Sequence, residues 1–228
     1  MSKTDQEKRK VYFVSGIDTG IGKTYATAVL ARSYTKSGKT AITQKMVQTG
    51  CSDISEDILL HRKLMGLRLL IADRTGTTCP YVFSYPASPH LSAELEEKEI
   101  CIDLIHSITE SLLTKYEVVL LEGAGGLMVP INRNILTIDY IAMFDLPVVL
   151  VTSGRLGSIN HTLLSLEACQ HRSIVVDKVI YNCFPLEDEL IADDTFRFLE
   201  SYLAKHHPSA QLLKLPEIKP ADNFVFEV

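Results

Sequence analysis

The chain has 228 residues, of which 46% are hydrophobic and 22% are charged, a balance typical of a globular protein with a buried core. Its net charge of −5 argues against a nucleic-acid partner, because proteins that bind nucleic acids usually carry an excess of lysine and arginine. Its five cysteines form no C-x-x-C pair, and its charged start is not a secretory signal, so we expect a cytoplasmic protein. No apolar run reaches the ~18 residues that cross a bilayer, so we expect no membrane partner.

Short apolar runs alternate along the chain with longer segments of helical periodicity. The predicted strands are residues 11–15, 40–45, 118–122, 147–153, 178–182 and 210–215, and the predicted helices are residues 23–37, 54–72, 100–114, 159–172 and 188–205. Nearly continuous apolar strands are typical of parallel strands that are covered on both faces. The pattern predicts an α/β fold with a doubly wound, mostly parallel sheet of the P-loop NTPase-like kind, in a single domain of residues 1–228.

Three regions depart from this alternation. Residues 1–10 are mostly charged or polar, and we expect them to be flexible. Residues 74–99 are the one long irregular stretch, and a loop of that length inside a compact domain is usually functional. Beyond the helix and strand named above, the sequence does not decide how residues 183–228 fold.

The stretch "GIDTGIGKT" (16–24) joins the first predicted strand to the first predicted helix. Backbone N–H groups of such a glycine loop can wrap a polyphosphate, and the helix N-terminus adds a favourable dipole. In this arrangement Lys23 reaches the β- and γ-phosphates, and the Thr24 hydroxyl is a ligand of Mg²⁺. Gly16 precedes Gly22 by six positions, so the loop is one residue longer than in the usual pattern.

A phosphate loop of this kind needs a metal-binding carboxylate at the end of another strand. Glu122 meets this need, because in "VVLLEGAGG" it ends an apolar run and is followed by glycines. Further acidic side chains precede an apolar helix in "SDISEDILL", namely Asp53, Glu56 and Asp57. Helix N-capping accounts for one of these three without any functional role.

Five segments, in this order along the chain, resemble the dethiobiotin synthetase family of ATP-dependent carboxylases. They are "GIDTGIGKT" (16–24), "QKMVQTG" (44–50), "CPYVFSYPASPH" (79–90), "LLEGAGGLMVPI" (120–131) and "GRLGSINH" (154–161). The elongated glycine loop is itself a mark of this family. The resemblance covers most of residues 11 to 182 and rests on the set of motifs, since no single motif would suffice.

The resemblance implies a reaction, its cofactor and its catalytic residues. Family members close the ring of 7,8-diaminopelargonate with CO₂ and ATP, through a carbamate that is phosphorylated and then attacked by the neighbouring amine. Lys23 and Lys45 match the two catalytic lysines of the family. The implied cofactor is Mg²⁺, with ATP as co-substrate and with the diamine and CO₂ or bicarbonate as the other substrates.

The resemblance also implies the binding residues and a homodimer. Nucleotide contacts would come from Asp18, Thr19, Gly20, Ile21, Gly22, Lys23, Thr24, Tyr25 and Asn182. The diamine would contact Thr19, Thr49, Pro86 and, across the dimer interface, the start of a helix at Ser158, Ile159 and Asn160. The metal ligands would be Thr24, Asp57 and Glu122, with Asp53 as an alternative to Asp57. His90 is interpreted as a structural or helix-start residue.

The alternative from another class is a switch ATPase of the partition or division-site type, which shares the fold and acts through protein partners. Such proteins carry a signature lysine five residues before the second loop lysine, and here that position holds Asp18. The C-terminal segment departs from the dethiobiotin synthetase pattern, with Lys214 where a glycine is typical. We therefore expect looser selectivity for the nucleotide base than is usual in that family.

Overall fold

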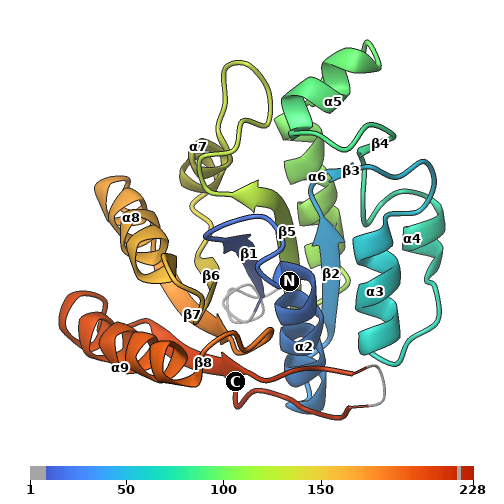
Figure 1. Ribbon diagram of the computed structural model, residues 1–228. Helices are drawn as coiled ribbons and strands as arrows, with labels where there is room; N and C mark the ends of the chain where they lie inside the picture. The colour runs from blue at the N-terminus through green and yellow to red at the C-terminus, as the bar shows by residue number, and fades with distance from the viewer. Residues whose placement is uncertain (1–8, 220–221) are drawn as a thin grey trace.

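The computed structural model describes residues 9–219 and 222–228, and its central feature is a six-stranded parallel sheet (Figure 1). The strand order is β2-β5-β1-β6-β7-β8. The strands are β1 (Lys10–Gly16), β2 (Ala41–Lys45), β5 (Val118–Gly126), β6 (Val148–Ser153), β7 (Val176–Asn182) and β8 (Gln211–Leu215). A small separate parallel sheet pairs β3 (Gln48–Thr49) with β4 (Val82–Phe83).

Helices connect the strands and cover both faces of the large sheet. In the part of the chain that the structure describes they are α2 (Lys23–Lys36), α3 (Glu56–Leu64), α4 (Ile71–Arg74), α5 (Pro89–Leu95), α6 (Ile102–Leu113), α7 (Thr137–Met143), α8 (Ser158–His171) and α9 (Glu189–His206). Each of them is too short or too polar to span a lipid bilayer.

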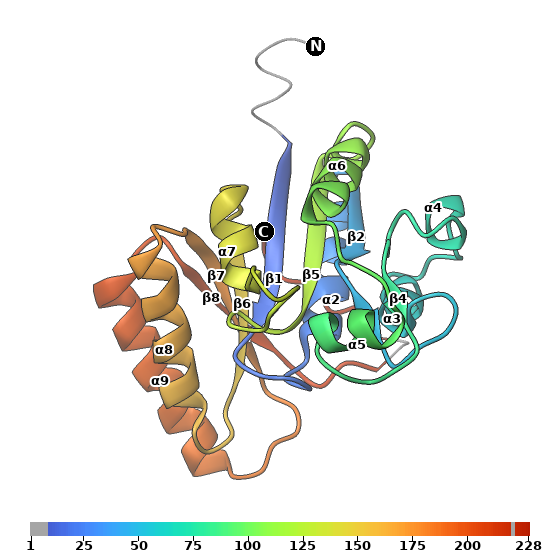
Figure 2. The same cartoon turned by 90° about the horizontal axis from the view of Figure 1, so that it is seen from above.

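The core consists of two apolar layers, one on each face of the sheet. Alternate residues of a strand point to opposite faces, so Tyr12 and Val14 of β1 pack with α2, whereas Val11 and Phe13 pack in the layer of α6, α7, α8 and α9. Figures 1 and 2 show α2 and α8 on opposite sides of the sheet. The predicted doubly wound sheet is confirmed, and all six predicted strands are present.

The position of β1 decides where a ligand can bind. It lies between β5 and β6, and β5 separates it from β2. The loops that leave the carboxyl ends of β1, β2 and β5 therefore meet at one edge of the sheet. In open α/β sheets, ligands bind in the crevice beyond these strand ends.

Some predicted elements were wrong in extent. The helix expected over residues 54–72 is split, because α3 ends at Leu64 and Gly66 follows with a left-handed φ of 69° before the separate helix α4. The stretch 74–99 is not irregular throughout, since it contains β4 and α5. Of the N-terminal residues expected to be flexible, 1–8 lie outside the described residues, and Lys10 already belongs to β1.

The last part of the C-terminal segment, residues 222–228, follows β8 and packs against α2. Arg32 of α2, which is buried, donates to the carbonyls of Leu64 (2.9 Å), Asp222 (2.6 Å) and Phe224. The Phe226 ring lies in the apolar layer of α2, and its backbone N–H donates to Ser33 Oγ (2.9 Å). One guanidinium therefore holds α2, α3 and the C-terminal segment together.

We predict that Arg32→Leu lowers the free energy of unfolding by about 2 kcal/mol, the range of hydrogen bonds made by a charged group, because three carbonyls lose their donor. Urea denaturation measures this difference. The matched control is Lys36→Leu, which removes a single exposed contact of 3.1 Å to the carbonyl of Asn223 and should change stability little. Equal unfolding midpoints for the two variants would contradict the anchoring role of Arg32.

Candidate active site

The loop between β1 and α2 is shaped by Gly22 and held by Asn182. Gly22 precedes α2 with a φ of 100°, and a Cβ atom at this position would lie 2.5 Å from Nδ2 of Asn182. Asn182, at the end of β7, donates from Nδ2 to the carbonyls of Ile21 (3.0 Å) and Phe184 (2.8 Å). The loop is thereby fastened at the N-terminus of α2, where the helix dipole favours an anion.

Lys23 folds back over this loop, and its charge interacts with that of Lys45. Its side chain is buried, with 7% of the residue exposed, and its ammonium donates to the carbonyl of Asp18 at 2.9 Å. Burial lowers the pKa of Lys23 to about 8; attraction to Glu122 opposes this shift and repulsion from Lys45 adds to it. The two ammonium groups therefore share one electrostatic environment.

Lys45 lies at the end of β2, in register with Glu122 at the end of the buried part of β5. Its Nζ contacts Asp57 Oδ2 at 2.5 Å, Glu122 Oε1 at 2.8 Å and the Gly123 carbonyl at 3.1 Å. Burial alone would lower the pKa of Lys45, but the two carboxylates outweigh burial and raise it. Burial would likewise raise the pKa of Glu122, but Lys45 and His61 hold it well below its usual range. The pair is therefore charged.

Three side chains that could bind a metal through oxygen lie together, namely Thr24, Asp57 and Glu122. The Thr24 hydroxyl lies 3.0 Å from Asp57 Oδ1 and 3.2 Å from Glu122 Oε1. A hydroxyl and two carboxylates form a hard donor set that suits Mg²⁺, with water and phosphate completing the coordination. Within the described ranges, no cluster of three or more His, Cys, Asp or Glu side chains could hold a metal by itself.

These side chains surround a cavity of about 390 Å³. Its lining includes most of the residues expected at the site from the sequence, namely Thr19, Gly20, Gly22, Lys23, Thr24, Tyr25, Lys45, Thr49, Asp57 and Glu122. Asp53 does not line it and lies instead in neighbouring hollows that include Ser52 and Ile54. Of the two alternative aspartates, Asp57 is therefore the one beside Thr24 and Lys45.

Other expected residues lie outside this cavity. Ile21 is buried beneath the loop, and the Asp18 carboxylate forms an ion pair with Arg155 at 2.5 Å. Pro86 lies near Gly50, since a Cβ atom on that glycine would be 3.1 Å from the proline ring. His90 is the second residue of α5, in agreement with its interpretation as a helix-start residue.

The start of α8 lies beside a different cavity. Ser158 is buried, with its hydroxyl 3.0 Å from that of Ser153, while Ile159 and Asn160 line a groove of about 840 Å³ between the starts of α8 and α9. Within one chain, residues 158–160 therefore do not line the cavity of the phosphate loop.

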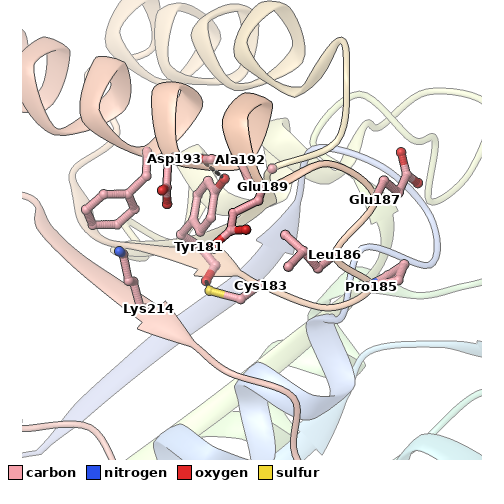
Figure 3. Close-up of a pocket in the computed structure, with 11 residues that line it drawn as sticks. Tyr181, Cys183, Pro185, Leu186, Glu187, Glu189, Ala192, Asp193 and Lys214 are labelled. Atoms are coloured by element: carbon pink, nitrogen blue, oxygen red, sulfur yellow. Dashed lines mark hydrogen bonds between the residues drawn. The ribbon is translucent and has the colours of Figure 1, made fainter.

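A third cavity, of about 170 Å³, lies between β7, β8 and α9 (Figure 3). Figure 3 shows Lys214 and Tyr181 beneath α9, and the Lys214 ammonium lies 3.9 Å from the centre of the Phe196 ring. The Tyr181 hydroxyl donates to the Ala192 carbonyl at 2.7 Å. Lys214, which stands where the family typically has a glycine, is thus directed toward Phe196 of α9. The expectation of looser selectivity for the nucleotide base stays a prediction.

Sequence reasoning missed His61, which contacts Glu122 from α3. Its Nε2 lies 2.9 Å from Glu122 Oε2, and the residue is fully buried. The available signal was its spacing, because His61 follows Asp57 by four positions and so lies on the same face of the helix. A histidine within an apolar helical pattern does not by itself reveal that partner.

Comparisons with known proteins identify the family of this chain. Residues 10–223 match a family model described as an AAA domain. The chain is 53% identical over 204 residues to "ATP-dependent dethiobiotin synthetase BioD 2" of Haemophilus ducreyi, which covers 90% of this chain and 97% of that protein. It is 51% identical to "ATP-dependent dethiobiotin synthetase BioD" of Chlorobaculum tepidum, covering 87% of this chain and 83% of that protein.

Solved structures show similarity of fold alone. The MinD cell division protein of Aquifex aeolicus has a TM-score of 0.55 at 16% identity, covering 92% of this chain and 82% of that chain. A ParA family ATPase of Chlorobium tepidum has a TM-score of 0.53 at 13% identity, covering 92% and 86%. Sequence identity above one half across nearly full-length relatives is far more specific, and this chain belongs to the dethiobiotin synthetase family.

Proposed function

We propose that this protein is a cytoplasmic, ATP- and Mg²⁺-dependent dethiobiotin synthetase, a ligase that closes the ring of 7,8-diaminopelargonate with CO₂. The observation that carries the proposal is the pair of ammonium groups, Lys23 and Lys45, at one cavity beside a phosphate loop. A switch ATPase of the partition or division-site type would carry its second lysine within the phosphate loop, where this chain has Asp18, and needs no lysine at the end of β2. A carboxylation that gathers a carbamate and a triphosphate needs both.

The proposed chemistry has three steps. CO₂ adds to one amine of the substrate, which loses a proton, and a carbamate forms. A carbamate oxygen then attacks the γ-phosphorus of ATP, the bond to the bridging oxygen breaks, and ADP leaves. Finally the second amine attacks the carbonyl carbon of the mixed anhydride, loses a proton and expels phosphate, which closes the cyclic urea.

The two lysines would stabilise the charge that gathers in the second step. In phosphoryl transfer the protein contributes mainly positioning and electrostatic stabilisation. Lys23, on the phosphate loop, would contact the γ-phosphate, and Lys45, from the end of β2, would hold the carbamate and the phosphoryl group in transfer. Both groups are buried and fixed by hydrogen bonds, so little reorganisation is needed when charge develops.

Thr24, Asp57 and Glu122 would hold Mg²⁺. When bound, the ion would neutralise charge on the β- and γ-phosphates. The Thr24 hydroxyl lies within hydrogen-bond distance of both carboxylates, which supports this assignment. The remaining nucleotide contacts would come from the loop between β1 and α2, Tyr25 and Asn182.

We further propose that the diamine lies between Thr19, Thr49 and Pro86 of one subunit and the start of α8 of a second copy. Backbone N–H groups at Ser158, Ile159 and Asn160 would bind the substrate carboxylate. Large apolar side chains are exposed around this helix start, among them Leu156 (82%) and Leu190 (76%). Such side chains favour burial in a dimer interface.

The direct test incubates the protein with 7,8-diaminopelargonate, bicarbonate, Mg²⁺ and ATP. We expect phosphate release equal to the amount of cyclic urea detected by mass spectrometry, because each ring closure consumes one ATP. Omitting the diamine is the control. Phosphate release that is independent of the diamine would instead favour the switch ATPase.

Lys23→Met and Lys45→Met should each lower kcat by about 100-fold or more, because the transition state loses a preorganised donor. Single-turnover measurements with saturating substrates give this rate. Lys39→Met, which changes an exposed lysine before β2, is the matched control and should retain its rate. Near-normal turnover in either test variant would remove that lysine from the site.

Asn160→Asp should raise the KM for the diamine about tenfold, because it adds a negative charge where the substrate carboxylate would bind, while the KM for ATP changes little. Mixing this variant with Lys45→Met should restore activity at low diamine concentration. In the mixed dimer, one site combines an intact Lys45 with an intact Asn160 from the other subunit. Absence of recovery after subunit exchange would contradict a site shared between subunits.

A further inference from the structure

His61 is fully buried and contacts Glu122, one of the two carboxylates proposed as metal ligands. It lies on α3 one turn after Asp57, so both side chains are on one face of the helix, Asp57 against Thr24 and Lys45 and His61 against Glu122. Its Nε2 is 2.9 Å from Glu122 Oε2. No other part of the proposed mechanism uses this residue.

The two oxygens of Glu122 have separate surroundings. Oε1 is close to Lys45 Nζ (2.8 Å) and Thr24 Oγ1 (3.2 Å), both of which line the phosphate cavity. Oε2 is turned the other way and is contacted by His61. Since the Glu122 side chain is buried, Oε2 has no access to solvent that could replace a lost donor.

The ring of His61 must donate in this contact. Glu122 accepts from the ammonium of Lys45 (2.8 Å) and from the hydroxyl of Thr24 (3.2 Å) at Oε1, so its side chain is placed as a hydrogen-bond acceptor. Nε2 therefore carries the proton. Among the described residues Nδ1 has no hydrogen-bond partner, so Nε2 makes the one hydrogen bond of this ring.

The neighbouring residue fixes the helix that carries this ring. Arg62 donates to Asp73 (2.9 Å from Nε, 2.8 Å from Nη2) and to Thr43 Oγ1 (2.8 Å), which ties α3 to β2 and to α4. The backbone of α3 is thus fixed at the residue next to His61 while the imidazole contacts Glu122. This is the arrangement expected of an orienting group, because its own position is fixed independently of the ligand.

We propose that His61 is a positioning residue that holds Oε2 of Glu122 through its Nε2–H group, so that Oε1 alone faces the phosphate cavity and is presented to the metal. This inference rests on the proposed role of Glu122 as a Mg²⁺ ligand. One face of α3 then supplies a metal ligand, Asp57, together with the group that orients the other carboxylate.

The test measures binding of Mn²⁺, a spectroscopic stand-in for Mg²⁺, to the full-length protein saturated with ADP, with free Mn²⁺ read by electron paramagnetic resonance. His61→Leu should weaken Mn²⁺ binding about tenfold or more, the usual cost of removing a group that orients a metal ligand. His61→Gln should recover most of the affinity, because the glutamine amide nitrogen can take the place of Nε2. His61→Asn should not recover the affinity, because the asparagine side chain is one methylene shorter and its amide nitrogen does not reach Oε2.

Two controls are needed. The first tests whether any loss of buried contacts weakens Mn²⁺ binding, and the second tests whether Glu122 is a metal ligand at all. Ser33→Ala removes two buried hydrogen bonds, one to the Val29 carbonyl (2.7 Å) and one from the Phe226 N–H group (2.9 Å), neither of which involves the proposed metal ligands, and it should leave Mn²⁺ binding unchanged. Glu122→Gln removes the proposed ligand charge and should abolish most of the binding. If Glu122→Gln binds Mn²⁺ as the wild type does, the metal assignment is wrong and the inference is overturned with it.

The remaining outcomes decide the role of His61 alone. Unchanged binding in His61→Leu, with the Glu122→Gln loss intact, would overturn the proposal. Equal losses in the Gln and Asn variants would also overturn it, because then ring shape and not the N–H donor would matter. If His61→Leu does not fold, the difference in Mn²⁺ affinity between His61→Gln and His61→Asn still decides whether His61 acts as a donor. Dethiobiotin formation by the wild type is measured separately, because it tests the proposed function and not the role of His61.

Discussion

The buried ion pair between Lys45 and Glu122 is the interaction on which the rest of the site depends. A charge in the protein interior is strongly unfavourable unless a partner compensates it, and removing either member would leave the other uncompensated. The pair exists because β2 and β5 are adjacent parallel strands whose register sets residue 45 opposite residue 122. The sheet topology thus places opposite charges at the point where the phosphate loop begins α2.

This dependence explains why so much of the site was predictable from the sequence. An apolar run that ends in a polar residue indicates the carboxyl edge of a parallel sheet, and Glu122 follows such a run within β5. Lys23 and Thr24 follow from the glycine loop before a helix. Lys45 ends β2, but its proposed role came from the resemblance to the family, because a lysine at a strand end is by itself more often a surface residue.

Roles that depend on tertiary contacts were not predictable in this way. The split of α3 from α4 follows from Gly66 together with the Arg62–Asp73 contact, which joins segments that look like one helical run. His61 and Arg32 lie within ordinary helical patterns, and their partners are 61 and up to 192 residues away. The short helices α5 and α7 have only seven residues each, too few for periodicity to stand out.

The contact between Arg32 and the backbone of Phe224 has a consequence for biosynthesis. The helix that begins at the phosphate loop leaves the ribosome early, yet its apolar side is completed by Phe226. At ribosomal elongation rates the intervening 192 residues take on the order of ten seconds or more to be made. Until Phe226 has been made, the apolar side of α2 lacks the cover that this ring gives it, and exposed apolar surface of this kind is prone to aggregation.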